Sequence, residues 1–149
     1  MLSDDVIPVT PSGDLLGLGL PLCLKAGSWP VLRDCRPDLP QAQVVMRYGQ
    51  PVRYLPPAGR AVTAGVRPGL LLFPHYQPDG TPRWTRLTPA QVLQRVVAAE
   101  AVIRDLTQAK LEALARWAGA APAFALTYPD LDHALALVRG RLAAMAAPG

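Results

Sequence analysis

The sequence predicts an α/β fold, of the α+β kind for a fragment, with a mixed β-sheet in the N-terminal two thirds followed by packing helices. Up to residue 87, apolar residues recur at every second position or in short runs between turn residues, which is typical of strands. From Thr88 onward they recur every three or four residues, which is typical of helices. We therefore expect one partial domain over residues 1–149, with mainly strands over 1–87 and helices with one late strand over 88–149.

The composition fits a single folded domain. The chain has 149 residues, half of them hydrophobic and only 17% charged, which argues against disorder. The net charge of +4 comes mostly from arginines that are spread along the chain, so the sequence does not predict binding to nucleic acid. The two cysteines, Cys23 and Cys35, fit neither a disulfide framework nor a zinc spacing.

The sequence also argues against membrane insertion. No charged segment followed by an apolar segment opens the chain, and no uncharged run reaches the roughly 18 to 20 residues that a membrane helix needs. The longest candidate, residues 118–129, is short and contains Pro122. We therefore expect a cytoplasmic protein with no membrane partner.

The first strands are predicted from alternation and turn residues. Residues 6–9 and 15–16 flank the turn formers of residues 10–14, which predicts a hairpin. In residues 18–25 the leucines at even positions share one face, and Pro21 on the other face argues for an edge strand or a bulge. Residues 29–40 show no periodicity, so we expect a loop there, with room for a helical turn.

Three further strands follow. Residues 44–48 and 51–55, joined at Gly49-Gln50, predict a hairpin of β-branched and aromatic residues. Residues 70–73 form a continuous apolar run, which is typical of a strand covered on both faces, so we expect this strand to be central. Residues 83–87 predict a short strand.

The helices begin at Thr88. Thr88, Pro89 and Gln91 supply an N-cap hydroxyl, a proline at the first helical position and a capping glutamine. One apolar stripe then follows at Val92, Val96, Ala99, Ile103 and Leu106. A second helix is expected from Thr107 to Gly119, a late strand over 123–128, and a last helix capped by Asp130, with His133 inert near its exposed face.

The adjacent carboxylates of Asp4 and Asp5 are the first candidate site. They follow a short apolar lead and precede β-branched residues, as at the end of a buried strand. Hard oxygen ligands suit Mg²⁺, which takes one or two carboxylates and leaves its other positions to water and phosphates. The alternative is a solvated chain end or a turn. A phosphate cradle of the form G-x-x-x-x-G-K-[ST] occurs nowhere in the sequence.

Lys25 and His75 lie at strand ends. Lys25 precedes the small, flexible segment 26–28, from which its ammonium could reach a bound phosphate as a point charge. The alternative is an ordinary exposed lysine. His75 follows the expected central strand, where it is either a ligand or base, or a surface and packing residue. No Ser/His/Asp or Cys/His set has a recognisable geometry.

Five segments together carry a resemblance that none carries alone. They are Leu2-Ser3-Asp4-Asp5-Val6-Ile7-Pro8, Leu20-Pro21-Leu22-Cys23-Leu24-Lys25-Ala26-Gly27-Ser28, Leu71-Leu72-Phe73-Pro74-His75-Tyr76, Leu87-Thr88 and Tyr128-Pro129-Asp130-Leu131-Asp132. In order and spacing they resemble the downstream part of the P-loop kinase domain of the HPr kinase/phosphorylase family. The resemblance is closer to the divergent bacterial members found beside peptide-modification genes.

The resemblance implies roles for three residues. In that family the Asp pair ends a metal-binding strand and follows a strand, a G-x-x-G-x-G-K-[ST] loop and a helix. It implies that Asp4 and Asp5 are catalytic and bind metal: one carboxylate holds Mg²⁺ with the phosphates of ATP, and the other is the base for an acceptor hydroxyl. Which residue has which role stays open. Lys25 matches a recurrent lysine of the divergent branch, which implies a phosphate-binding position.

Two departures from the family pattern shape the expected function. The sequence begins at the Asp pair, so the loop that would cradle ATP is missing, and the longer signature of the true HPr kinases is not recognisable, which argues against HPr as the substrate. We expect the C-terminal part of an ATP-dependent phosphotransferase that acts on a hydroxyl of a peptide or protein and is inactive without its phosphate-binding loop.

Two other functions stay open. One is a non-catalytic binding or scaffold module that retains the kinase-like fold and presents its sheet edges to a peptide or protein. The other is a metal-dependent phosphate hydrolase that uses Asp4 and Asp5 without the loop. Loss of the first strand and helix would leave an open sheet edge and an uncovered apolar face. We therefore expect a homo-oligomer or an association with an upstream partner fragment.

Overall fold

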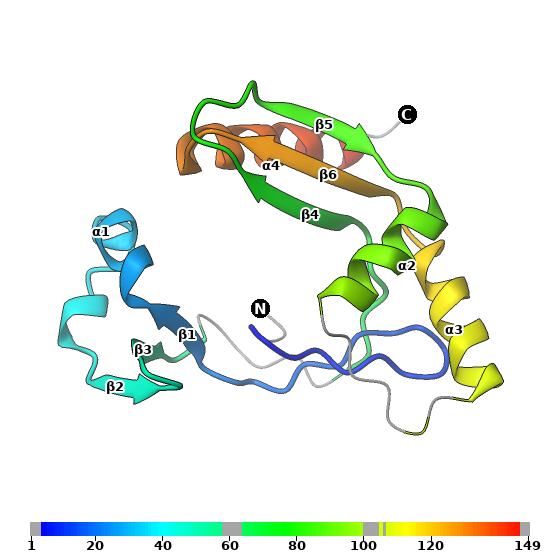
Figure 1. Cartoon of the computed structure of the whole chain (residues 1–149), viewed down its shortest axis with the longest axis horizontal. Helices are drawn as coiled ribbons and strands as arrows, with labels where there is room; N and C mark the ends of the chain where they lie inside the picture. The colour runs from blue at the N-terminus through cyan, green and yellow to red at the C-terminus, as the bar shows by residue number, and fades with distance from the viewer. Residues whose placement is uncertain (1–3, 58–63, 100–104, 106, 147–149) are drawn as a thin grey trace. The chain divides into compact units, whose positions relative to one another are not determined.

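The computed structural model describes residues 4–57, 64–99, 105 and 107–146. The chain divides into two compact units, Met1–Arg67 and Pro68–Gly149, which are considered one at a time. Each contains one three-stranded sheet, and helices complete the fold (Figure 1). The expected mixture of strands and helices is confirmed, with the strands before Thr88 divided between two sheets. That residues 1–149 form one partial domain stays a prediction.

The sheet of the first unit is antiparallel. It consists of β1 (Leu22–Lys25), β2 (Val44–Arg47) and β3 (Gln50–Leu55) in the order β1-β3-β2. The expected hairpin is present, but its turn is Tyr48-Gly49, both with positive φ, because Gln50 already pairs with Arg47. β1 is an outer strand and begins just after Pro21, in agreement with the edge position that the proline favours.

Short helical turns connect β1 to β2. These are η1 (Ala26–Ser28), α1 (Trp29–Leu32) and η2 (Leu39–Gln41), where the sequence predicted a loop with room for one helical turn. Leu39 is only 2% exposed, and Val52 and Leu55 of β3 are also buried. The core of this unit is therefore small.

The expected hairpin over residues 6–16 is reduced to a turn and single bridges. Thr10 N–H donates to the Asp14 carbonyl at 2.9 Å, and Val9 pairs with Leu15 in an isolated bridge. Leu15 also pairs with Val66. The turn chemistry of residues 10–14 was therefore identified correctly, but the flanking residues are too few to form a ladder.

The sheet of the second unit is mixed. It contains β4 (Leu71–Tyr76), β5 (Arg83–Arg86) and β6 (Ala123–Tyr128) in the order β4-β6-β5. β4 runs parallel to β6, whereas β5 is antiparallel to it. The expectation that the apolar run at residues 70–73 is the central strand is wrong. β4 has one strand neighbour, and the late strand β6 lies at the centre because it pairs on both sides.

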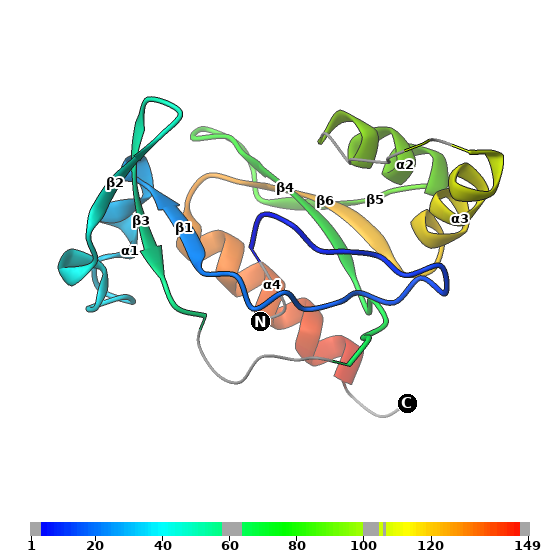
Figure 2. The same ribbon diagram turned by 90° about the horizontal axis from the view of Figure 1, so that it is seen from below.

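Three helices accompany this sheet: α2 (Pro89–Ala98), α3 (Gln108–Ala118) and α4 (Leu131–Ala146). The capping box predicted at Thr88 is present, since Thr88 Oγ1 accepts from Gln91 N–H and Gln91 Oε1 accepts from Thr88 N–H. Ile103 and Leu106 of the expected stripe lie outside the described residues. α2 and α3 lie together near the start of β6, and α4 runs along β6 (Figures 1 and 2).

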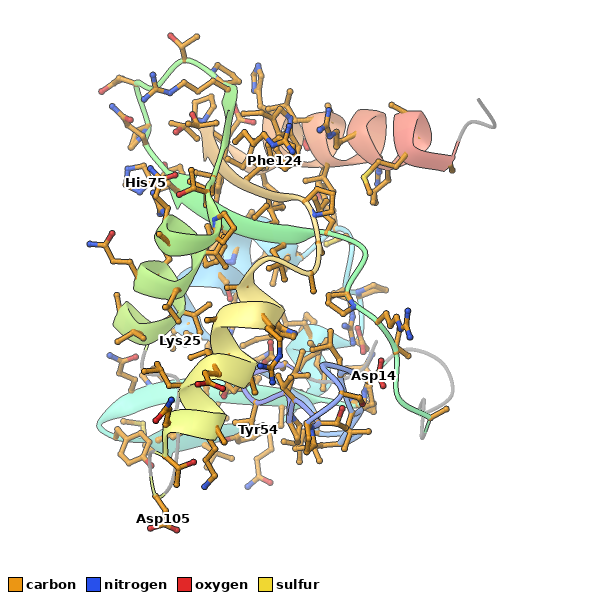
Figure 3. All side chains as sticks on the ribbon, turned by 90° about the vertical axis from the view of Figure 1, so that its right-hand side faces the viewer. Asp14, Lys25, Tyr54, His75, Asp105 and Phe124 are labelled. Atoms are coloured by element: carbon orange, nitrogen blue, oxygen red, sulfur yellow. The ribbon has the colours of Figure 1, made fainter. Side chains whose placement is uncertain are left out.

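The core of the second unit lies on β6 and the helices. Val92 of α2 is completely buried and packs in a cluster with Leu87, Ala118 and Ala123. Phe124, the next residue of β6 and labelled in Figure 3, points to the other face. There it contacts Trp84 edge-on and the Arg141 guanidinium of α4. Helices therefore contact both faces of β6. Within the described residues, no helix combines the length and apolarity needed to cross a bilayer.

Candidate functional site

The Asp4 carboxylate is bound to the outer edge of β1. Asp4 Oδ2 accepts a hydrogen bond from the Cys23 backbone N–H at 2.8 Å. Asp4 and Asp5 are both exposed and lie in a bend, and residues 1–3, which include the short apolar lead, lie outside the described residues. The contact gives a partner to a backbone donor on an outer strand, where a strand neighbour is lacking on that side. Asp4 therefore has a structural contact besides any chemical role.

The Asp5 carboxylate is paired with an arginine from β2. Asp5 Oδ2 lies 2.9 Å from Arg47 Nη1, which is also 3.3 Å from Cys23 Sγ. Hydrogen bonding to Asp5, and then to Cys23, raises the pKa of the Arg47 guanidinium above its usual range. Because both partners remain substantially exposed, water and salt weaken their attraction. The pair fixes the position of Asp5 more than it stabilises the fold.

Lys25 shares a face of the sheet with this group. It is the last residue of β1, two positions after Cys23, so the two side chains point to the same side of the strand. Its carbonyl accepts from Ser28 Oγ at 2.8 Å, while its ammonium forms no ion pair with any residue of the described part. The structure thus links Asp4 and Asp5 to Cys23 and places Lys25 on the Cys23 face.

The donor set fits a magnesium ion only in part. In the described ranges, no group of three or more His, Cys, Asp or Glu side chains comes together. Asp4 and Asp5 each have one oxygen engaged by the protein and one oxygen left over. Two hard oxygen donors suit Mg²⁺ when water and substrate phosphates fill its other positions. The phosphates would need a holder that these 149 residues do not contain.

The two histidines lie elsewhere in the fold. His75 is in β4, exposed and directed away from the sheet (Figure 3). His133 contacts Asp130 at the start of α4: its backbone N–H donates to Asp130 Oδ1 at 2.9 Å, and its Nδ1 lies 2.8 Å from Asp130 Oδ2. Both contacts hold the pKa of Asp130 below its usual range, the backbone contact most strongly. This pair caps α4. That His133 has no chemical role stays a prediction.

The sequence did not single out Arg47 as a site residue. Arg47 and Asp5 are 42 residues apart, so no local spacing connects them. The sequence showed only that Arg47 is a cation near the end of an expected strand. Exposed arginines at such positions are common, so this did not point to a site. Their contact becomes visible only once the strand order is known.

No protein-family model matches this chain, and no curated protein or solved structure is similar to it. The resemblance to the HPr kinase family therefore stays a prediction that rests on the sequence segments alone. The comparisons do not supply an activity, a substrate or a partner.

Proposed function

We propose that the chain is the C-terminal part of an ATP-dependent phosphotransferase of the HPr-kinase type, acting on a hydroxyl of a peptide or protein. The observation that carries the proposal is the connection of Asp4 and Asp5 to β1 and β2, with Lys25 on the Cys23 face. Carboxylates suit a metal-bound phosphate and its acceptor, and a lysine suits a phosphate oxygen. The cytoplasm, where ATP is plentiful, is the proposed location.

The roles follow from the contacts that each side chain already makes. Asp5 is already paired with Arg47, whereas Asp4 forms no ion pair with any residue that the structure describes. We therefore assign Asp4 as the base that accepts the proton of the acceptor hydroxyl, and Asp5 as the carboxylate that holds Mg²⁺. The Lys25 ammonium would bind a phosphate oxygen. Mg²⁺ and ATP, when bound, supply the phosphoryl group and neutralise its charge.

Transfer would need a phosphate-binding segment from outside these 149 residues. A backbone cradle normally holds the β- and γ-phosphates, and the sequence has no motif for one. The chain alone is therefore proposed to be inactive. Calorimetry with Mg-ATP tests this part of the proposal, because micromolar binding by residues 1–149 would contradict it.

The metal site can be tested without a nucleotide, by adding Mn²⁺ as a paramagnetic probe. The Cys23 backbone amide is hydrogen-bonded to Asp4, so its NMR signal should broaden when Mn²⁺ binds to the acidic pair. Broadening should fall sharply in Asp4→Asn and Asp5→Asn. Asp34→Asn, which removes one exposed carboxylate from the same unit, is the matched control and should leave the broadening unchanged. Equal broadening in all four proteins would overturn the metal assignment.

A second function, a non-catalytic binding module, is favoured by the outer strand β2. Val44, Val45 and Met46 of this strand are 46%, 41% and 64% exposed. An exposed apolar outer strand can add the strand of an extended peptide through backbone hydrogen bonds. Under this proposal Asp4 and Asp5 serve only their structural contacts. Mn²⁺ would then fail to broaden the Cys23 amide selectively, which separates the two functions.

A further inference from the structure

The first unit contains a small hollow with two arginines in its wall. The hollow has a volume of about 250 Å³ and lies among η1, α1, η2 and β3. Arg33 and Arg53 line it together with the apolar side chains of Trp29, Pro30, Leu39 and Pro40. No acidic residue of the described part lines it. The wall therefore carries positive charge with no carboxylate facing it.

Contacts within the unit hold the Arg53 guanidinium in place. Arg53 Nη1 donates to the Leu39 carbonyl, and the guanidinium carbon lies 4.5 Å from the centre of the Trp29 ring. The Trp29 indole is fixed in turn, because its Nε1–H donates to the Leu24 carbonyl at 2.9 Å. A cation that is already positioned loses little conformational entropy when it binds an anion.

The chain does not satisfy these two arginines by itself. Arg53 Nε is buried and has no hydrogen-bond partner among the residues that the structure describes. The Arg33 side chain is exposed and forms no hydrogen bond or ion pair within the same residues. Asp38, close in sequence, is already engaged by Arg36 at 2.7 Å and is unavailable to the hollow. Buried polar groups without partners are uncommon and call for an explanation.

Size and wall chemistry restrict the ligand. Sites for drug-sized ligands measure roughly 300 to 1,000 Å³, so this hollow suits a group smaller than a nucleotide. A guanidinium binds carboxylates and phosphates through its planar fork. The indole and the two prolines favour a ligand with a hydrocarbon stem over a fully hydrated inorganic ion.

We propose that this hollow binds a carboxylate on a short hydrocarbon stem, with Arg33 and Arg53 as the cationic contacts and Trp29 against the stem. The carboxylate can belong to a glutamate side chain of a peptide or to a free short-chain acid. The site uses none of the residues assigned to phosphoryl transfer. The binding proposal can therefore be confirmed or refuted independently of the proposed phosphotransferase function.

The Trp29 indole N–H signal in a proton–nitrogen NMR spectrum of the full chain reports on binding. We expect butyrate to shift this signal saturably, whereas butyramide, which has a similar shape but no charge, leaves it in place. Arg33→Gln should weaken butyrate binding about tenfold, as expected for the loss of one charge-assisted hydrogen bond. Arg83→Gln removes an exposed arginine from the other unit and should leave the affinity unchanged.

Further ligands identify the source of the carboxylate. Tighter binding of a blocked Gly-Glu-Gly peptide than of butyrate supports a peptide ligand, and the reverse supports a free acid. The proposal is overturned if Arg33→Gln binds butyrate as tightly as the unaltered chain, or if butyramide binds equally well. Tighter binding of inorganic phosphate than of either carboxylate also overturns it.

Discussion

Truncating Leu126 tests the central position of β6. This side chain is 1% exposed, and the strand that carries it pairs on both sides. Leu126→Ala removes three carbon atoms from the core, worth about 2.4 kcal/mol at roughly 0.8 kcal/mol per buried group. A residual cavity adds to this, so we expect a loss of about 3 to 4 kcal/mol in the free energy of unfolding. Because the free energy of unfolding of an ordinary domain is only about 5 to 15 kcal/mol, this loss would be a large fraction of it.

Leu72→Ala is the matched comparison, because it makes the same chemical change in the outer strand β4. Leu72 is only partly buried and has a strand neighbour on one side, so we expect a loss of about 1 to 2 kcal/mol. Urea unfolding measures both losses when it is followed through the fluorescence of Trp84, with Trp29 and Trp117 replaced by phenylalanine in every variant, since Trp84 is in register with Leu126. Equal losses, or a greater loss for Leu72→Ala, would contradict the assignment of β6 as the central strand.

Three further predictions follow from contacts at exposed positions. Thr88→Ala should lower the free energy of unfolding by about 1 kcal/mol through loss of the N-cap of α2, whereas Thr88→Ser keeps the hydroxyl and should lose much less in the same urea titration. The pKa of Asp130 is lowered from 3.8, so its contribution to stability is present above that pH and is lost as the pH falls below it. Asp130→Asn should therefore flatten the acid part of a plot of helical circular dichroism against pH, and an unchanged acid limb would contradict this. Finally, sedimentation should detect self-association through the exposed strand β2, and Val45→Lys should reduce it; a monomeric unaltered chain would refute the expectation.

Local features of the fold could be predicted from the sequence. Thr88, Pro89 and Gln91 specify a helix start within four residues, and that start is present. The β2–β3 hairpin is likewise set by a short segment and its turn, although the turn is displaced by one residue. Such features depend on neighbours along the chain, which a sequence displays directly.

Long-range pairing could not be predicted in the same way. The apolar run at the start of β4 has the composition of a buried strand, but its position depends on β6, which follows only after β5 and two helices. The partners in the candidate site are equally distant: Asp4 contacts Cys23, and Asp5 contacts Arg47. The stacking of Arg53 on Trp29 is another contact of this kind. The sequence shows which residues are charged, but it does not show which residues those side chains contact in the fold.

The strand order of the second unit also has a consequence for biosynthesis. Among the residues that the structure describes, β4 and β5 have no ladder with each other and pair only with β6, which is made last of the three. While the ribosome is still translating α2 and α3, β4 and β5 lack their strand partner, so their backbone groups stay unpaired and their apolar side chains stay exposed. Late, non-local pairing of this kind slows folding and leaves the nascent chain open to aggregation. Chaperone dependence during translation should therefore end only after β6 has left the exit tunnel.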